Sequence, residues 1–236
     1  SIVRLVPAPA GRIVGGSIKL KGRELLTLSE EEIRRVRGSE IGMILQDPQS
    51  SLDPVFSIGF QLEEVFQLTG RQPREAVRVK AVQALRDVQI PDPERRIRNF
   101  PHEMSGGMKQ RVVGSIAISR NPRVIIADEP TTSLDVTIQA QYLRLLSSIQ
   151  EQTDTSVIFI THDFGIVARM CDRVAVMYAG RIVEQAGVQE IFDNPRHPYT
   201  QALIRSVPSP KRKVTRLESI KGQPPAPWDL PAGCRF

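Results

Sequence analysis

The sequence predicts an α/β fold in which a mostly parallel β-sheet is covered by helices. Residues 123–127 and 156–161 are short apolar stretches of the kind that form buried strands, and residues 136–152 between them show the apolar period of a helix. A strand, a helix and a second strand over this length form a βαβ unit, which requires a parallel sheet. Residues 41–45 form a third apolar stretch and predict a further buried strand.

The first part of the chain is predicted to contain short elements. Residues 1–6 are expected to be the tail of a helix, because the prolines that follow cannot continue one. Residues 17–21 alternate in polarity like a short strand. Residues 29–37 predict a polar helix, with Ser29 as its N-cap and Glu32 as the capping-box partner three residues later.

The middle of the chain, residues 57–120, is predicted to be a helical insert. Apolar residues recur there at the three- and four-residue spacing of a helix face. They are Val77, Ala81, Ala84, Leu85 and Val88. Farther along, residues 173–178 and 181–185 predict a hairpin. Prolines become frequent from Pro195 onward, which predicts a short helix followed by an extended, loosely packed tail.

Composition excludes several classes of protein. The 236 residues are 40% hydrophobic, which excludes wholesale disorder, and no apolar stretch approaches the ~18 residues that cross a bilayer. Two cysteines cannot form a disulfide framework or a four-cysteine zinc site, so we expect a reducing, cytosolic setting. The net charge of +6 is compatible with nucleic acid, lipid headgroups or a phosphorylated ligand. Charges of both signs are interspersed, however, except in a late basic run around Lys211.

Two carboxylates, Asp128 and Glu129, directly follow the apolar stretch 123–127. Ligands of an open parallel sheet bind beyond the carboxyl ends of its strands. Phosphoryl transfer from a nucleotide requires a metal ion that neutralises the phosphates and a group that orients or deprotonates the attacking water. Asp128 suits the first task and Glu129 the second, although a strand that merely ends in two solvated acids gives the same pattern.

Three further polar segments follow predicted strands or begin a predicted helix. Gln46 ends the strand 41–45 and could ligate a metal ion or hold the water, or be an ordinary loop amide. His162 follows the strand after the Asp128 strand, although a lone histidine is usually structural. Ser105, Gly106 and Gly107 begin a helix. Such glycines let a backbone approach phosphate, but a plain helix start also has this sequence.

In this order and spacing, these segments resemble the motifs of the ABC-type ATPases, the nucleotide-binding subunits of ATP-binding-cassette transporters. Gln46 matches the Q-loop, Ser105-Gly106-Gly107 the signature loop, Asp128-Glu129 the Walker B strand, Ser133-Leu134-Asp135 the D-loop and His162 the switch histidine. The resemblance implies a P-loop NTPase-like fold with ATP and Mg²⁺ as cofactors. It also implies a head-to-tail dimer, in which each nucleotide lies between the phosphate loop of one subunit and the signature loop of the other.

The resemblance also implies a role for each site residue. Asp128 would hold Mg²⁺, with Gln46 as a further metal ligand and catalytic group. Glu129 would act on the water as the catalytic carboxylate, and His162 would contact the γ-phosphate. The residues that would serve the partner's nucleotide are Ser105, Gly106, Gly107 and Asp135.

The tail resembles the C-terminal extension of the oligopeptide, dipeptide and nickel importer ATPases, through residues 194–203, 207–210 and 222–225. Met108, where most of the family has Gln, fits that subfamily. The resemblance implies a peripheral subunit on the cytoplasmic face of the inner membrane. Its partners would be a second ATP-binding subunit and membrane permease subunits, without direct contact with nucleic acid or the transported substrate. A cysteine cluster that can hold an iron–sulfur centre often follows this tail, and Cys234 would be its first member; the sequence holds no further member, so we infer no such cluster.

Two alternatives to an importer subunit stay open. The first is a soluble ABC-type ATPase that acts on nucleic acid or ribosomes, which the positive charge would favour. The second is a non-catalytic fragment, which the absence of a phosphate loop would favour. The compact insert between Gln46 and Ser105 favours a transporter, because chromosome-structuring and repair relatives carry a very long coiled coil there.

The phosphate loop, G-x-x-x-x-G-K-[ST], does not occur in the sequence. We therefore expect it upstream of residue 1, and expect this chain to carry the trans half of an ATP site without binding ATP tightly in cis. A missing central strand would expose apolar sheet edge and favour association. The expected parts are a partial ATPase core (1–56), a helical subdomain with the signature loop (57–120), the remaining ATPase core (121–194) and a proline-rich extension (195–236).

Overall fold

The computed structural model describes residues 1–68, 70, 72–132, 134–207, 220 and 222–236. The basic run around Lys211 and the D-loop residue Ser133 lie outside this part of the chain. Two compact units are present, Ser1–Ile160 and Thr161–Phe236. The division into four parts made from the sequence stays a prediction. Among the described residues, no helix combines the length and apolar character that a bilayer-spanning segment requires.

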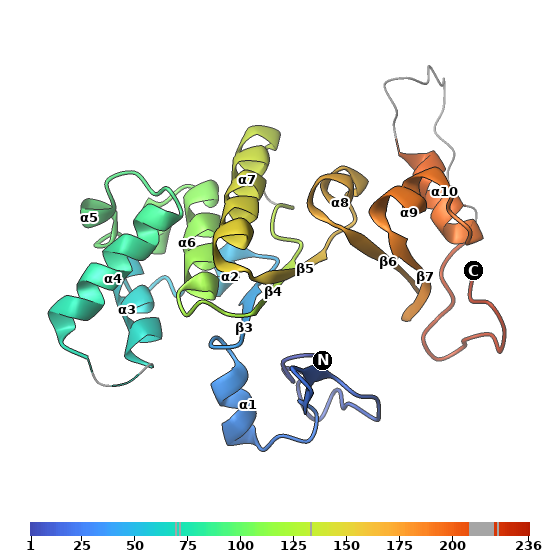
Figure 1. The fold of residues 1–236 in the computed structure, drawn as a ribbon, viewed down its shortest axis with the longest axis horizontal. Helices are drawn as coiled ribbons and strands as arrows, with labels where there is room; N and C mark the ends of the chain where they lie inside the picture. The colour runs from blue at the N-terminus through green and yellow to red at the C-terminus, as the bar shows by residue number, and fades with distance from the viewer. Residues whose placement is uncertain (69, 71, 133, 208–219, 221) are drawn as a thin grey trace. The chain divides into compact units, whose positions relative to one another are not determined.

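A three-stranded parallel sheet forms the centre of the first unit (Figure 1). Its strands, in spatial order, are β3 (Ile41–Ile44), β4 (Val124–Asp128) and β5 (Ser156–Ile160). Val124 lies opposite Ile41 on one side and Ser156 on the other. Helix α7 (Val136–Thr153) connects β4 to β5 along the chain, so the predicted βαβ unit is confirmed. The parallel register brings the residues that follow β3 and β4 to the same edge of the sheet.

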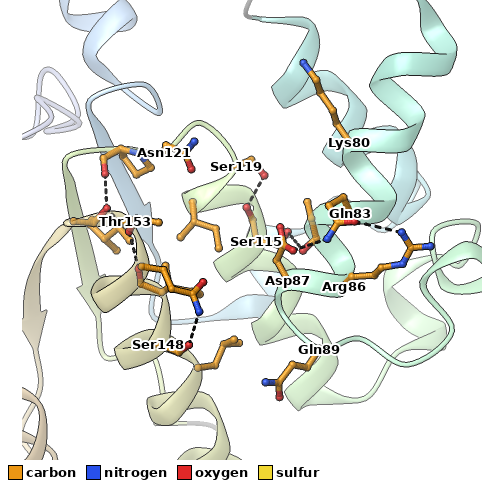
Figure 2. Close-up of a pocket in the computed structure, with 18 of the residues that line it drawn as sticks. Lys80, Gln83, Arg86, Asp87, Gln89, Ser115, Ser119, Asn121, Ser148 and Thr153 are labelled. Carbon is orange, nitrogen blue, oxygen red and sulfur yellow. Dashed lines mark hydrogen bonds between the residues drawn. The ribbon is translucent and has the colours of Figure 1, made fainter.

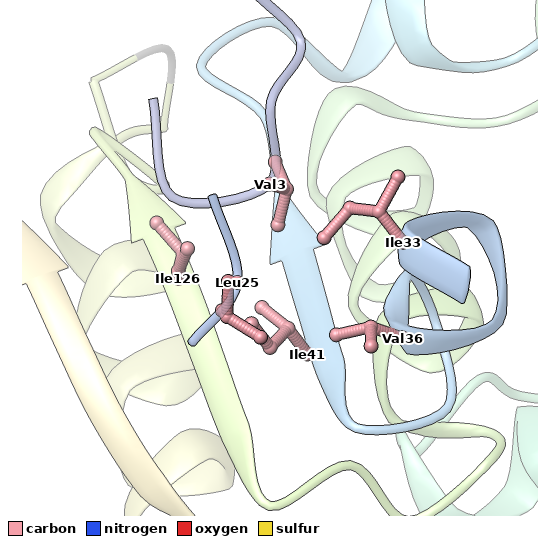
Figure 3. Packing of buried hydrophobic residues seen from close by; sticks show 6 residues of the cluster. All are labelled: Val3, Leu25, Ile33, Val36, Ile41 and Ile126. Carbon is pink, nitrogen blue, oxygen red and sulfur yellow. The ribbon is translucent and has the colours of Figure 1, made fainter. Parts of the chain in front are cut away.

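The central strand β4 is covered on both faces. Neighbouring side chains of a strand point in opposite directions, so two adjacent isoleucines of β4 contact different elements. Ile126 joins an apolar cluster with the N-terminal segment and α1 (Glu30–Val36) (Figure 3). The cluster consists of Val3, Leu25, Ile33, Val36, Ile41 and Ile126. Ile125 points to the other face, toward residues of α6 and α7 such as Ile118 and Leu145.

The N-terminal residues correct one prediction. Residues 1–6 form no helix; instead the Arg4 N–H donates to the Ser1 carbonyl at 2.9 Å, and Arg4 has a φ of 53°. The turn lets Val3 reach the core, where it is 7% exposed. Arg37 Nε donates to the Val3 carbonyl at 2.9 Å and holds the segment against α1. The burial of Val3, and not helix propensity, therefore determines the conformation of residues 1–6.

The capping box of α1 is confirmed. Ser29 Oγ accepts from the Glu32 N–H at 3.3 Å, and the Glu32 carboxylate accepts from the Ser29 N–H at 2.8 Å. The strand expected over residues 17–21 is shorter than predicted. It consists of β1 (Lys19–Leu20), which pairs with β2 (Arg23–Glu24) across a turn.

Glu24 holds the β1–β2 turn through hydrogen bonds, so the stability of the fold should depend on pH. Hydrogen bonds from Ser17 Oγ and from the Ile18 and Leu26 N–H groups lower the pKa of its carboxyl from 4.5 to about 2. A lowered pKa stabilises the fold above pH 4.5, and this stabilisation is lost as the pH falls toward 2. Glu24→Gln should therefore lower the thermal midpoint at pH 7, and its deficit relative to wild type should shrink between pH 5 and pH 2.

Thermal unfolding monitored by circular dichroism across this pH range measures the effect. Glu151→Gln removes an equal charge from an exposed position of α7 and controls for net charge. A deficit for Glu24→Gln that stays constant down to pH 2 would contradict the assignment.

The predicted helical insert is confirmed as a group of short helices. Within residues 57–120 they are α3 (Ile58–Gln67), α4 (Arg74–Asp87), α5 (Pro93–Arg96), a 3₁₀ turn (Pro101–Glu103) and α6 (Gly106–Ile118). A further short helix, α2 (Pro48–Ser51), precedes the predicted insert. The apolar face predicted for α4 is buried at Val77, Ala81 and Leu85. An ion pair of 2.8 Å between Arg78 and Glu63 joins α4 to α3.

Strand β5 lies at the edge of the described sheet. It was predicted to be buried, but its side chains alternate between exposed and half-buried, and Ile158 and Ile160 are 42% and 46% exposed. A strand at the edge of a sheet presents unpaired backbone N–H and C=O groups, which are a template for pairing with another chain. Association through this edge stays a prediction.

The second unit is built around an antiparallel hairpin. Its elements are α8 (Phe164–Met170), β6 (Arg173–Tyr178), β7 (Arg181–Gly187), α9 (Val188–Asp193) and α10 (Pro198–Ser206). The predicted hairpin and short helix are present; α8 and α9 were not predicted. The described residues 222–235 form no helix or strand and are mostly exposed, as predicted. The terminal Phe236 is an exception, because its ring lies 5.4 Å from that of Tyr178 and 5.3 Å from that of Tyr199.

Candidate functional site

Strands β3 and β4 bring two predicted site residues into contact. Gln46 Nε2 donates to Glu129 Oε2 at 2.9 Å, although the two residues lie 83 positions apart in the sequence. Asp128 is the last residue of β4 and precedes Glu129 at the same edge of the sheet. The carboxyl edge therefore holds an amide and two carboxylates together, as the parallel topology predicted.

The backbone of Glu129 is strained. Its φ of 42° lies in the left-handed region, where a residue with a Cβ costs about 1–3 kcal/mol and which occurs preferentially at functional sites. The Glu129 N–H donates to the Ile160 carbonyl at 2.9 Å, which fixes this conformation against the end of β5. The strain therefore turns the side chain toward Gln46 instead of continuing β4.

Thr132 is a site residue that sequence reasoning missed. Its Oγ1 donates to Glu129 Oε2 at 3.0 Å, and its N–H donates to the Glu129 carbonyl at 3.3 Å in a turn. Oε2 thus accepts from both Gln46 and Thr132. The signal that could have found it is a hydroxyl residue three positions after the carboxylate, within reach of a turn.

The donor set at this edge suits Mg²⁺, which prefers oxygen ligands and needs only one or two carboxylates when phosphates supply others. Asp128 offers a carboxylate. Because Gln46 Nε2 is engaged with Glu129, the amide oxygen is the Gln46 atom that can ligate a cation. Among the described residues, no group of three or more His, Cys, Asp or Glu side chains forms a complete protein-only metal site.

The predicted signature residues begin helix α6. Ser105 is its N-cap, and Ser105 Oγ accepts from the Met108 N–H at 3.3 Å. Ser105 and Gly106 are exposed, and a Cβ built on Gly106 would meet nothing within 4 Å. Gly107 is half-buried and faces α7. The open side of this helix start is therefore at Ser105 and Gly106.

Asp135 is the N-cap of α7. Its Oδ1 accepts from the N–H groups of Thr137 and Ile138, both at 3.0 Å. The Asp135 carboxylate therefore stabilises the start of α7, independently of any contact with a nucleotide.

Asp135→Ala should cost about 1 kcal/mol of unfolding free energy, because the first turn of α7 loses its cap. Asp135→Asn keeps the capping oxygen and should lose only a small part of this energy. Urea unfolding of both variants measures the difference. An equal loss in both variants would show that charge, and not the cap, stabilises the helix.

His162 lies in the second unit, two residues after β5 along the chain, as predicted. The following residue, Asp163, caps α8 by accepting from the Gly165 N–H at 2.7 Å. The catalytic role of His162 stays a prediction.

The first unit also contains a cavity of about 520 Å³ between α4, α6 and α7 (Figure 2). Polar and apolar groups line it in about equal measure, and Ser115 at its floor donates to the Ala84 carbonyl at 2.9 Å. None of the site residues predicted from the sequence lines it. The cavity is therefore separate from the candidate nucleotide site.

Comparisons with known proteins agree with the motifs. Residues 5–132 match the ABC transporter family, and residues 183–236 match the oligopeptide/dipeptide transporter C-terminal region. The chain is 52% identical to a probable peptide ABC transporter ATP-binding protein of Sinorhizobium fredii and 51% identical to the oligopeptide transport ATP-binding protein OppD of Bacillus subtilis. Both alignments cover 100% of this chain, and they cover 71% and 66% of the two relatives.

Solved structures of ABC cassettes share the fold. A dimeric bacterial ABC transporter cassette matches with a TM-score of 0.65 at 26% identity, and the alignment covers 74% of each chain. The cbiO1 protein of Clostridium perfringens, part of an ABC transporter complex, matches with a TM-score of 0.66 at 29% identity over 77% of this chain and 69% of that one. The predicted P-loop NTPase-like fold is thereby confirmed, and neither the families nor these relatives favour the nucleic-acid alternative. The chain belongs to the ABC transporter family, and the relatives above are ATP-binding proteins of peptide transporters.

Proposed function

We propose that this chain is part of the ATP-binding and ATP-hydrolysing subunit that energises an importer of peptides. The hydrogen bond between Gln46 and Glu129 beside Asp128 carries this proposal, because it assembles the groups that nucleotide hydrolysis needs at one edge of the sheet. The peptide class rests on the relatives' names and on the match of the C-terminal region.

Glu129 orients the attacking water and accepts its proton. Gln46 and Thr132 both donate to Oε2, which fixes the orientation of the carboxylate. Asp128 and the Gln46 amide oxygen would hold Mg²⁺, which when bound neutralises phosphate charge. The strained backbone of Glu129 keeps the carboxylate at this edge without further rearrangement.

Ser105, Gly106 and Asp135 serve the nucleotide of a second ATP-binding subunit, and His162 contacts the γ-phosphate. The head-to-tail dimer that the resemblance implies and the exposed N-termini of α6 and α7 support this arrangement. The 236 residues contain no phosphate loop, so the chain by itself should not bind ATP tightly. Micromolar binding in a fluorescent nucleotide titration of these residues alone would contradict this.

The other partners are membrane permease subunits, and the subunit works at the cytoplasmic face of the inner membrane. Transport of a peptide requires a membrane pathway that no described helix of this chain can provide. The transported peptide contacts other subunits of the complex, and Asp128 and Glu129 act only on the nucleotide.

The test is ATP hydrolysis by the complete transporter complex in proteoliposomes. Addition of a mixture of short peptides is expected to stimulate hydrolysis, and DNA or ribosomes are expected to have no effect. Nickel salts provide a further arm, because the extension also resembles that of nickel importers. Stimulation by DNA or ribosomes without a response to peptide or nickel would overturn the proposal.

A further inference from the structure

Helices α6 and α7, whose N-termini carry candidate nucleotide contacts, touch each other in their first turns. A Cβ built on Gly107 would lie 2.7 Å from Ile138 Cγ2, closer than real side chains approach. A Cβ built on Gly106 would meet nothing within 4 Å. The two adjacent glycines therefore differ: Gly106 leaves room for a ligand, whereas Gly107 leaves room for Ile138.

The contact is extended along one face of α6. Arg111, four residues after Gly107, donates to Gln141 Oε1 on α7 at 3.2 Å and to the Val88 carbonyl at 3.1 Å. Gly114, one turn farther, lies against α7 in the same way, because a Cβ there would lie 2.8 Å from the Tyr142 hydroxyl. Residues separated by three or four positions share a helix face, so these contacts form one continuous interface between α6 and α7.

Ile138 is itself tied to the cap of α7. Its N–H donates to Asp135 Oδ1 at 3.0 Å, so a displacement of Ile138 also displaces Asp135. A β-branched side chain in a helix has one strongly preferred χ1 rotamer, so the Cγ2 group cannot turn aside easily. An added methyl group at position 107 would therefore push the two helix starts apart.

We propose that Ile138 is a positioning residue, which packs on the bare Cα of Gly107 and holds Ser105 and Asp135 at a fixed separation for the nucleotide of the second subunit. The proposal rests on the proposed function. It adds a packing role for Gly107 to the sequence-based expectation, because the Cβ position of Gly107 is taken by Ile138, whereas that of Gly106 is open.

The test is a double-mutant cycle in the complete transporter complex. Gly107→Ala should lower the ATPase kcat by about 10- to 100-fold, because displaced contacts misplace the reacting groups. Adding Ile138→Ala removes the clashing Cγ2 group and should restore kcat to within about threefold of Ile138→Ala alone. Gly106→Ala provides the matched comparison, because any loss it causes should not be relieved by Ile138→Ala.

A second cycle in urea unfolding uses the same variants of the 236-residue chain. The midpoint should fall in Gly107→Ala and recover in part in the double variant. A double variant as inactive as Gly107→Ala, or a Gly107→Ala complex with wild-type kcat, overturns the positioning role. If the wild-type complex hydrolyses no ATP, the proposed function fails, whereas the unfolding cycle still decides whether Ile138 and Gly107 set the spacing of the two helices.

Discussion

Replacing Glu129 by glutamine should lower the ATPase kcat of the transporter complex by at least about 100-fold, the usual contribution of a general base. The substitution keeps the size and shape of the side chain. The amide oxygen can still accept from Gln46 and Thr132 in the place of Oε2, and the amide nitrogen takes the place of Oε1. The site therefore stays assembled but has no group that accepts the proton of water.

Nucleotide affinity should change little in the same variant, because Glu129 acts on the water and not on the phosphates. We expect the Glu129→Gln complex to bind ATP and to accumulate in the ATP-bound state. Single-turnover hydrolysis and nucleotide retention on a filter measure the two properties separately. Glu151→Gln is the matched control, because Glu151 is an exposed glutamate of α7 remote in sequence from the site motifs. A Glu129→Gln complex with wild-type kcat would remove this residue from the catalytic role.

The placement of Gln46 and Glu129 at one edge of the sheet was predictable, whereas their hydrogen bond also requires β3 to pair with β4, which the sequence alone does not determine. Each residue follows an apolar stretch that forms a strand, and parallel strands end at the same edge. The capping box at Ser29 and Glu32 was predictable because its cause is local, since three residues of spacing determine it.

Features that depend on distant packing could not be predicted. The turn at Arg4 exists because Val3 is buried against residues of other elements, whereas the sequence there shows only prolines after an apolar stretch. Gly107 has no room for a side chain because Ile138 packs against it, whereas Gly106 has room. This difference arises from the packing of α7 on α6, which the sequence does not show. Short helices such as α8 carry too few turns for an apolar period to emerge.

Gly42 in β3 is the position where the smallest substitution should cost most stability. A Cβ there would lie 2.4 Å from the Ala117 carbonyl oxygen and 3.1 Å from Pro122 Cγ. The first of these atoms belongs to the backbone of α6, so no side-chain rotation relieves the clash. Gly42→Ala should therefore lower the unfolding free energy by about 2–3 kcal/mol, as overpacking of a closely packed core does.

Urea unfolding of the 236-residue chain measures this loss, with Gly15→Ala as the matched control, because a Cβ at Gly15 meets nothing within 4 Å. Equal midpoints for the two variants would contradict the assignment. The effect should also reach the site. Gly42 lies on the strand that leads to Gln46, so α6 can accommodate the methyl group only by displacing β3, which lengthens the bond from Gln46 to Glu129. Gly42→Ala complexes that remain folded should therefore hydrolyse ATP more slowly than Gly15→Ala complexes, because close packing of α6 on β3 sets the position of the catalytic amide.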